Sequence, residues 1–260
     1  MIGVIAGDVI GSVHEHTRIK STAFPLFDAR CSFTDDTVLT VATAYAILTG
    51  TSYETAYRDF GRRYPDAGYG GMFVQWLFAA HPRPYNSWGN GSAMRVAPVG
   101  LACVSVDDVL KEAERSAAVT HDHPEGIKGA QATALAVFLA RSGRSKEAIR
   151  DELTGRFGYD LSGSIDMIRP GYEWDVSCQG SVPAAVVAFL ESTDVEEAIR
   201  LAISLGGDAD TLAAIAGGIA HAFYRYVPRA IVEPLRERLP AEFLDVIDEF
   251  ERRFPLALTT

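Results

Sequence analysis

The chain has 260 residues, a hydrophobic fraction of 48% and a formal net charge of −10. That length is enough to bury one substantial core, and no long Pro-rich, polar or Gly/Ser-rich stretch marks a linker, so we expect a single domain over residues 1–260. The acidic balance leaves no basic face for phosphate backbones, which argues against nucleic-acid binding as the main function.

Targeting and membrane signals are also missing. The apolar N-terminal segment has no basic lead-in, and Asp8 interrupts it, so it does not read as a signal peptide. The longest apolar runs, residues 212–224 and 182–190, are shorter than the roughly 20 residues that a membrane span needs. The three cysteines are widely scattered, which fits reduced packing thiols. These features predict a cytoplasmic protein without membrane contacts, and a monomer is expected.

The first predicted helix covers residues 2–13. Gly3, Gly7 and Gly11 recur every four residues, so they share one face on which a neighbouring helix can pack closely. Asp8 lies within this segment. It either holds backbone groups around a metal site or is an ordinary hydrogen-bonded buried aspartate. In the following segment 14–16, His-Glu-His, the two imidazoles cannot share a helix face, which argues against zinc.

An acidic cluster, residues 34–37 with the sequence Thr-Asp-Asp-Thr, stands just before a predicted apolar helix over residues 38–48 that Gly50 ends. A second cluster, Gly-Gly-Asp-Ala-Asp-Thr at residues 206–211, precedes the small-residue helix 212–224. Buried carboxylates cost several kcal/mol when unpaired, and no adjacent Lys or Arg neutralises the second cluster. One reading is a helix cap at Asp210 or Thr211. The presence of two such clusters favours one shared cation site.

Further helical patterns fill the chain between and after these clusters. Strict apolar alternation is nearly absent, so we expect an all-α fold without a sheet. The glycine-rich turn 68–71 permits positive φ and close approach to a phosphate, although many such turns are only turns. Trp88, before another Gly/Asn turn, either stacks on a flat ring or anchors the core. The remaining expected helices span residues 53–63, 72–80, from about 92, 107–119, 124–139, 145–153, 182–191, 195–204, 228–239 and 241–254, and residues 155–180 are the least regular part.

Five blocks taken together resemble the ADP-ribosylglycohydrolase family, which includes the enzyme that reactivates dinitrogenase reductase. They run in family order from residue 3 to about residue 224. The blocks are Gly7-Asp8…Gly11…Glu15, Thr34-Asp35-Asp36-Thr37, Gly89-Asn90-Gly91-Ser92-Ala93-Met94-Arg95, Thr120-His121-x-His123-Pro124-Glu125-Gly126 and Gly206-Gly207-Asp208-Ala209-Asp210-Thr211.

The resemblance implies a compact, single-domain orthogonal helical bundle with a central cleft for two divalent cations, Mg²⁺ or Mn²⁺. It implies that Thr34, Asp35 and Asp36 bind one ion. It implies that Asp208 and Thr211 bind the other, with Asp210 shared. All of these ligands are hard oxygens, as such ions prefer. The implied substrate-binding residues are Gly68, Tyr69, Gly70, Gly71, Met72 and Ser87 at the diphosphate, His121 near it, and Trp88 beside the adenine, with Gly89 and Asn90.

The implied reaction is hydrolysis at the anomeric carbon of the distal ribose of an ADP-ribosyl group carried by a protein or a small conjugate. Glu15 and Asp36 are the expected catalytic residues, with Glu15 as the carboxylate beside the oxocarbenium-like carbon; without the resemblance, Glu15 would read as a surface residue. Gly68 stands where the arginine-cleaving bacterial branch is expected to carry Asp, which favours hydroxyl-linked substrates unless Asp66 compensates. The alternatives are a non-catalytic ADP-ribose or nucleotide binder or structural protein, and a metal phosphohydrolase acting on a pyrophosphate.

Overall fold

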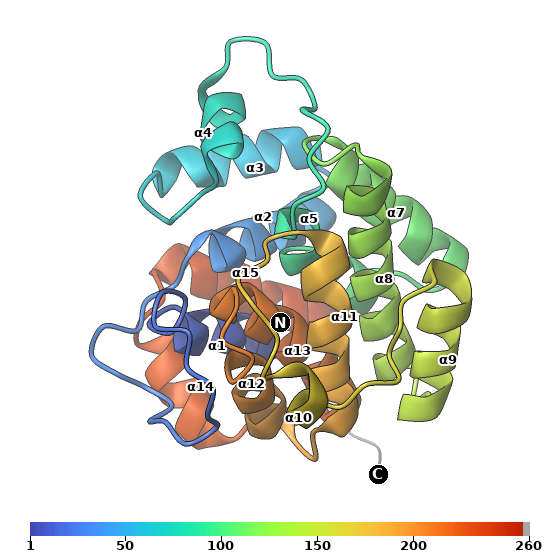
Figure 1. The fold of residues 1–260 in the computed structure, drawn as a ribbon. Coiled ribbons are helices and arrows are strands. Elements are labelled where there is room, and N and C mark those ends of the chain that lie inside the picture. Colours follow the sequence, from blue (N-terminus) through green and yellow to red (C-terminus); the bar gives the residue numbers. More distant parts are fainter. Residues whose placement is uncertain (257–260) are drawn as a thin grey trace.

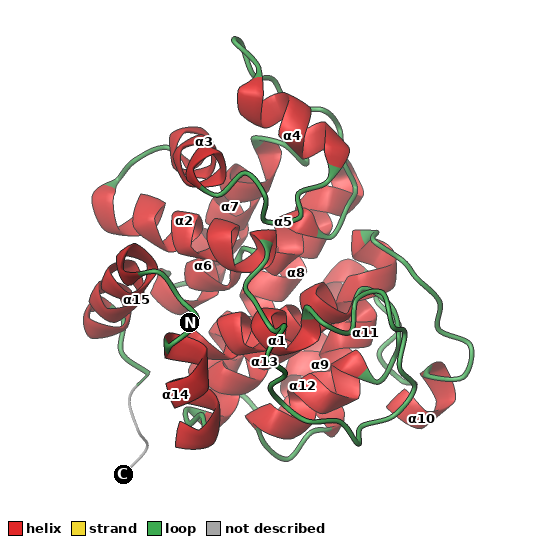
Figure 2. Cartoon of the chain, turned by 90° about the vertical axis from the view of Figure 1, so that its left-hand side faces the viewer, coloured by secondary structure: helices red, strands yellow, loops and turns green. Residues whose placement is uncertain are grey.

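The centre of the fold is a pair of helices, α1 (Ile2–Gly11) and α13 (Ala209–Tyr224). The structure is a computed structural model that describes residues 1–256. A Cβ placed on Gly7 would lie 2.1 Å from the carbonyl oxygen of Ala213, and one on Gly3 would lie 2.3 Å from that of Gly217. The two backbones are therefore in direct contact, as the spacing of the glycines predicts. Both views show α1 beside α13 in the middle of the molecule (Figure 1, Figure 2).

The first acidic cluster begins the next helix, α2 (Asp35–Thr49). Thr34 is its N-cap, because the Thr34 side chain accepts a hydrogen bond from the Asp36 N–H. Gly50 ends α2 in the left-handed conformation, with φ 76°. Helix α2 packs on α1, so the two segments that carry Asp8 and Asp36 are held side by side.

The other helices surround this centre. Helices α8, α11 and α12 pack on α13, and α3 and α4 lie at the top of Figure 1. Their bounds are α3 (Tyr53–Arg63), α4 (Gly71–Phe78), α5 (Gly91–Met94), α6 (Ala97–Ala102), α7 (Val106–Ala118), α8 (Pro124–Arg141), α9 (Lys146–Phe157), α10 (Ile165–Ile168), α11 (Cys178–Glu191), α12 (Val195–Ile203), α14 (Arg229–Arg236) and α15 (Ala241–Arg253).

The all-α expectation is confirmed. Across residues 1–256 the only strand-like pairing is an isolated bridge between Gly89 and Ser177. Over the same residues no helix is both long and apolar enough to cross a bilayer.

The sequence placed some boundaries wrongly. Helix α11 begins at Cys178, not at residue 182, because the Ser177 side chain caps it by accepting from the Gly180 N–H, and Pro183 is accommodated inside the helix. The helix expected from about residue 92 is a single turn, α5, followed by α6, which the pattern did not predict.

Candidate active site

A cavity of about 760 Å³ opens where the N-termini of α2 and α13 meet. It collects residues from seven separate stretches of the chain, including both acidic clusters. The predicted site residues that line it are Glu15, Thr34, Asp35, Asp36, Gly68, Gly70, Gly71, Met72, Ser87, Trp88, Gly89, Asn90, His121, Asp208, Asp210 and Thr211. Both acidic clusters therefore line the same cavity, and a shared cation site there stays a prediction.

A direct hydrogen bond joins the two clusters. The Thr211 hydroxyl donates to Oδ2 of Asp36 over 3.2 Å, although the two residues are 175 positions apart in the chain. The other oxygen of Asp36, Oδ1, is buried and has no hydrogen-bond partner. A buried oxygen of this kind is costly unless something outside the protein binds it.

Asp8 holds the first cluster in place from α1. Its carboxylate accepts hydrogen bonds from the Thr34 N–H at 3.0 Å, the Thr34 hydroxyl at 2.7 Å and the Thr37 N–H at 3.0 Å. The Thr37 hydroxyl also donates to it. Asp8 is fully buried, so this network fixes the loop that leads into α2. Asp8 is therefore a buried, hydrogen-bonded aspartate that also holds backbone groups of the first cluster, so both readings fit these contacts.

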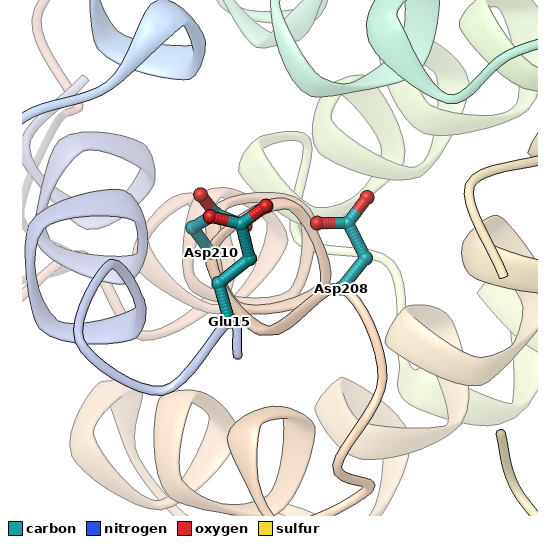
Figure 3. A group of neighbouring side chains, drawn as sticks. All are labelled: Glu15, Asp208 and Asp210. Atoms are coloured by element: carbon teal, nitrogen blue, oxygen red, sulfur yellow. The ribbon is translucent and has the colours of Figure 1, made fainter. Parts of the chain in front are cut away.

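Glu15 joins two carboxylates of the second acidic cluster at the start of α13. Oxygens of Glu15, Asp208 and Asp210 lie within 4.8 Å of one another, and Figure 3 shows the three side chains gathered together. Glu15 follows the end of α1, so the close packing of α1 on α13 brings it here. Asp208 is oriented by Asn90, whose side-chain amide donates to Asp208 Oδ2 at 2.6 Å. The three carboxylates form a group that could bind a metal ion.

Burial raises the pKa of every carboxyl group in the site. The pKa values of Asp36 and Asp210 lie well above the ordinary range, because both groups are desolvated and face other carboxylates. Burial, with Asp8 and Asp208 nearby, raises the pKa of Asp35 to about 8. The pKa of Glu15 is also raised, chiefly by burial. Among residues 1–256 the one ion pair made by these carboxylates joins Glu15 to His16 Nε2 over 3.7 Å, and none of them pairs with a Lys or Arg. The site thus holds excess potential negative charge.

The site residues fit a bound divalent cation. The unpartnered Oδ1 of Asp36 and the raised carboxyl pKa values both indicate missing positive charge. The available donors are carboxylate and hydroxyl oxygens, which suit Mg²⁺ and Mn²⁺. A cap at Asp210 alone does not account for these features; the Asp208 N-cap position has no side-chain cap hydrogen bond.

The glycine-rich turn forms another wall of the cavity. Gly68 has a φ of 97°, which favours glycine, and a Cβ there would lie 3.7 Å from a carboxylate oxygen of Asp35. Tyr69 does not line the cavity; its ring stacks on Phe73 with centroids 5.1 Å apart. Asp66 is exposed and is not among the lining residues either. Trp88 is 53% exposed, so it is not a core anchor.

Several lining residues were not predicted. Trp174 and Val176 come from the irregular stretch before α11, where no periodic pattern points to a role. They reach the cavity because the Asn90 N–H donates to the Val176 carbonyl at 2.8 Å. Tyr85 and Arg95 also line the cavity. Arg95 is the last residue of the block at residues 89–95, and membership of that block was the one sequence feature that could have pointed to the site.

Comparisons with known proteins agree with this geometry. The family model of the ADP-ribosylglycohydrolases matches residues 1–258. ADP-ribosylhydrolase ARH3 of Mus musculus is 29% identical, with 86% of this chain and 82% of the relative covered. ARH3 of Homo sapiens is 31% identical, with 74% and 70% covered. ADP-ribosylarginine hydrolase Tri1 of Pseudomonas putida is 33% identical over 52% of this chain and 38% of its own length.

A solved structure described as an ADP-ribosylglycohydrolase-related protein complex superimposes with a TM-score of 0.74 and 27% sequence identity. The match covers 96% of this chain and 95% of the other chain. The family model and the structural match thus extend over nearly the whole chain, including both acidic clusters and the cavity between them. The chain therefore belongs to the ADP-ribosylglycohydrolase family.

Proposed function

We propose that this protein is a metal-dependent hydrolase that cleaves the glycosidic bond between ADP-ribose and a modified protein side chain or small acceptor, and releases ADP-ribose. We propose that it acts as a single-domain monomer in the cytoplasm. The observation that carries the proposal is the meeting of the two acidic clusters, through Thr211 and Asp36, at the wall of a cavity of about 760 Å³. Family membership and the names of the relatives support the same reaction.

In this proposal two divalent cations, Mg²⁺ or Mn²⁺, are held by oxygen ligands from both clusters. Thr34, Asp35 and Asp36 hold one, Asp208 and Thr211 hold the other, and Asp210 contributes to both. Bound there, the ions would orient the ribose hydroxyls and a water molecule, which is the template role of a two-metal site. The buried and unpartnered Oδ1 of Asp36 supports its place among these ligands.

Glu15 is the proposed proton-transfer residue. Its carboxylate belongs to the same group as Asp208 and Asp210, and burial raises its pKa, so it can keep a proton to higher pH than an exposed glutamate. Cleavage of a glycosidic bond develops positive charge at the anomeric carbon, and a carboxyl group beside that carbon can protonate the leaving oxygen and then accept a proton from water.

The ADP part of the substrate would lie along the remaining walls. Trp88, exposed at 53%, offers a ring face to the adenine. The turn at residues 68–71 and the side chains of Met72, Ser87 and His121 would face the diphosphate, with Gly89 and Asn90 behind the ribose. Tyr69 would act only by supporting this turn, because its ring packs on Phe73.

We propose a hydroxyl-linked acceptor in preference to an arginine-linked one. Gly68 supplies no acid at the start of the turn, and exposed Asp66 does not line the cavity, so it does not compensate. A carboxylate at position 68 would also add negative charge beside Asp35.

A product assay tests the proposal. Serine-, arginine- and nucleobase-linked ADP-ribosyl substrates are incubated with the protein and Mg²⁺ or Mn²⁺, with and without EDTA, and the products are separated. The expected product is free ADP-ribose, fastest from the serine-linked substrate and lost with EDTA. Tight ADP-ribose binding without turnover would identify a binding protein instead, and AMP as product would identify a phosphohydrolase.

A further inference from the structure

Arg95, the residue after α5, is a buried cation without a counter-charge. It is 0% exposed, and it takes part in none of the ion pairs found among residues 1–256. Its Nη2 donates to the Ser116 carbonyl at 3.1 Å and to the Thr120 hydroxyl at 2.8 Å, and its guanidinium lies 4.3 Å from the centre of the Tyr57 ring. Nε and Nη1 have no hydrogen-bond partner. An unpaired buried charge is costly, so its position needs an explanation.

Thr120 connects Arg95 to the cavity. Its Oγ1 accepts from Arg95 and lies 2.8 Å from Nδ1 of His121. A hydroxyl has one proton to donate and two lone pairs that accept. Arg95 occupies one of these lone pairs, and the Thr120 hydroxyl keeps a proton that His121 Nδ1 can accept at this distance.

The surroundings of His121 disfavour its charged form. Burial, and then the nearby Arg95 cation, hold the pKa of His121 well below its usual range. The Tyr85 ring packs on the imidazole, with centroids 5.9 Å apart. The neighbouring Asp122 carboxylate accepts from the Asn86 N–H at 2.7 Å, and His123 Nδ1 accepts from the Glu125 N–H at 3.1 Å, so neither group is directed at the His121 ring.

We infer that Arg95 and Thr120 are positioning residues that hold His121 as a neutral imidazole with its proton on Nε2, so that the ring presents a fixed N–H donor to the diphosphate of the ligand. The inference rests on the proposed function for the identity of that ligand. His121 is 5% exposed and lines the cavity, and with Nδ1 occupied by Thr120 its Nε2 is the nitrogen that remains for a ligand. His121 then binds an anionic oxygen as a hydrogen-bond donor and does not transfer protons.

The direct test is nitrogen NMR of the ligand-free protein labelled with ¹⁵N-histidine. The chain has six histidines, and loss of one set of signals in His121→Gln assigns the resonances of interest. The expected result is an unprotonated Nδ1 and a protonated Nε2, unchanged from pH 5 to pH 8. A proton on Nδ1, or a titration of the His121 signals near pH 6.5, would overturn the inference.

The matched variants are Thr120→Val, which removes the hydroxyl at nearly constant volume, and Thr120→Ser, which restores it. Thr120→Val should bind ADP-ribose at least roughly 10-fold more weakly in calorimetry, because Nε2 is no longer held as the donor, and Thr120→Ser should recover most of the affinity. Equal affinity of wild type and a folded Thr120→Val would contradict the inference. If Thr120→Val does not fold, the wild-type NMR result decides alone.

The two proposals fail in different ways. A protein that binds ADP-ribose and shows the Nε2–H tautomer but releases no ADP-ribose from any conjugate overturns the proposed function and leaves this inference standing. A protein that hydrolyses conjugates but carries the proton on Nδ1 overturns this inference alone. Absence of any ADP-ribose binding by the wild type overturns both.

Discussion

Asp36 carries a buried carboxylate oxygen in the site that has no hydrogen-bond partner. One of its oxygens receives the Thr211 hydroxyl, and the other is buried without a partner. Replacing it by asparagine (Asp36→Asn) removes a negative charge from the proposed ligands while keeping the shape. We expect ADP-ribose release to fall by ~100-fold or more, since mutating even the residues that hydrogen-bond to metal ligands lowers metal affinity or activity by about 10–100-fold. Product release and calorimetric titration with Mn²⁺ measure the effect.

Asp66→Asn is the control for that experiment, because Asp66 is an exposed aspartate outside the cavity. It should keep wild-type activity and Mn²⁺ affinity. Full activity in Asp36→Asn, or an equal loss in both variants, would show that Asp36 is not a ligand.

Glu15 permits a sharper separation of binding from chemistry. Its carboxylate lies with those of Asp208 and Asp210, and its pKa is raised by burial. In Glu15→Gln the side chain can no longer exchange a proton, so kcat should drop by about 10²- to 10⁴-fold. The Kd for ADP-ribose, measured by calorimetry, should change far less. A variant that keeps kcat would exclude Glu15 as the proton-transfer residue.

At the scale of the helix, the site depends on how closely α1 approaches α13. Gly7 lies where a Cβ would stand 2.1 Å from the Ala213 carbonyl oxygen, and backbone cannot give way as a flexible side chain can. Gly7→Ala should therefore destabilise the protein by about 1–3 kcal/mol or more, as overpacking does. Relief of this clash would push α1 away from α13 and so move Asp8 away from Asp210. Mn²⁺ affinity should therefore also fall. Denaturant unfolding and calorimetry measure the two effects.

Gly155→Ala provides the matched comparison. Gly155 lies inside α9, and a Cβ there meets nothing within 4 Å. Alanine is the better helix former, so this variant should be more stable by about 0.5–1 kcal/mol and should bind Mn²⁺ like the wild type. A Gly7→Ala protein as stable as Gly155→Ala would mean that the contact of α1 with α13 does not hold the site together.

Local sequence signals made many of the helix boundaries predictable. Helix α3 spans residues 53–63 as expected, and Gly50 ends α2 as expected, because caps and apolar periodicity are encoded within a few residues. The start of α11 was missed because its capping residue, Ser177, lies in a stretch without periodicity. Helix α6 is short and buried on nearly every side, so it has no amphipathic pattern to detect.

At the scale of the whole molecule, the charge of the site couples metal binding to stability and pH. A carboxyl group whose pKa is raised on folding stabilises the protein below its unfolded pKa, and this contribution is lost as pH rises towards the folded pKa. Asp35, with a pKa of about 8, extends that loss to slightly alkaline pH. Metal-free protein should therefore lose stability between pH 6.5 and 8, and a divalent cation should raise Tm more at pH 8 than at pH 6.5.

Thermal unfolding in EDTA and in Mn²⁺ at the two pH values checks this expectation. Buried His221 does not interfere, because its pKa is lowered to about 3 and its contribution changes only between pH 3 and about 6.5. Asp35→Asn is the control, and in this variant the difference between the two pH values should shrink. An Mn²⁺ effect that is absent, or equal at both pH values, would argue against a cation among these carboxylates.

The molecular scale is also where prediction from sequence reached its limit. The sequence suggested one shared site because unneutralised acids at two apolar helices require a common explanation. In the structure the Thr211–Asp36 hydrogen bond joins the two clusters. The grouping of Glu15 with Asp208 and Asp210, and the entry of Trp174 into the cavity, depend on long-range packing that no local pattern encodes. The arrangement of Arg95, Thr120 and His121 likewise appears only in three dimensions.

The central claim is that both acidic clusters bind divalent cations at the wall of the cavity. Anomalous diffraction from crystals grown with Mn²⁺ tests it most directly. The account predicts two anomalous peaks, one against Asp36 and one against Asp208, with Asp210 in contact with both. Crystals in which Mn²⁺ sits elsewhere, or in which Asp36 and Asp210 contact no ion at saturating Mn²⁺, would contradict it.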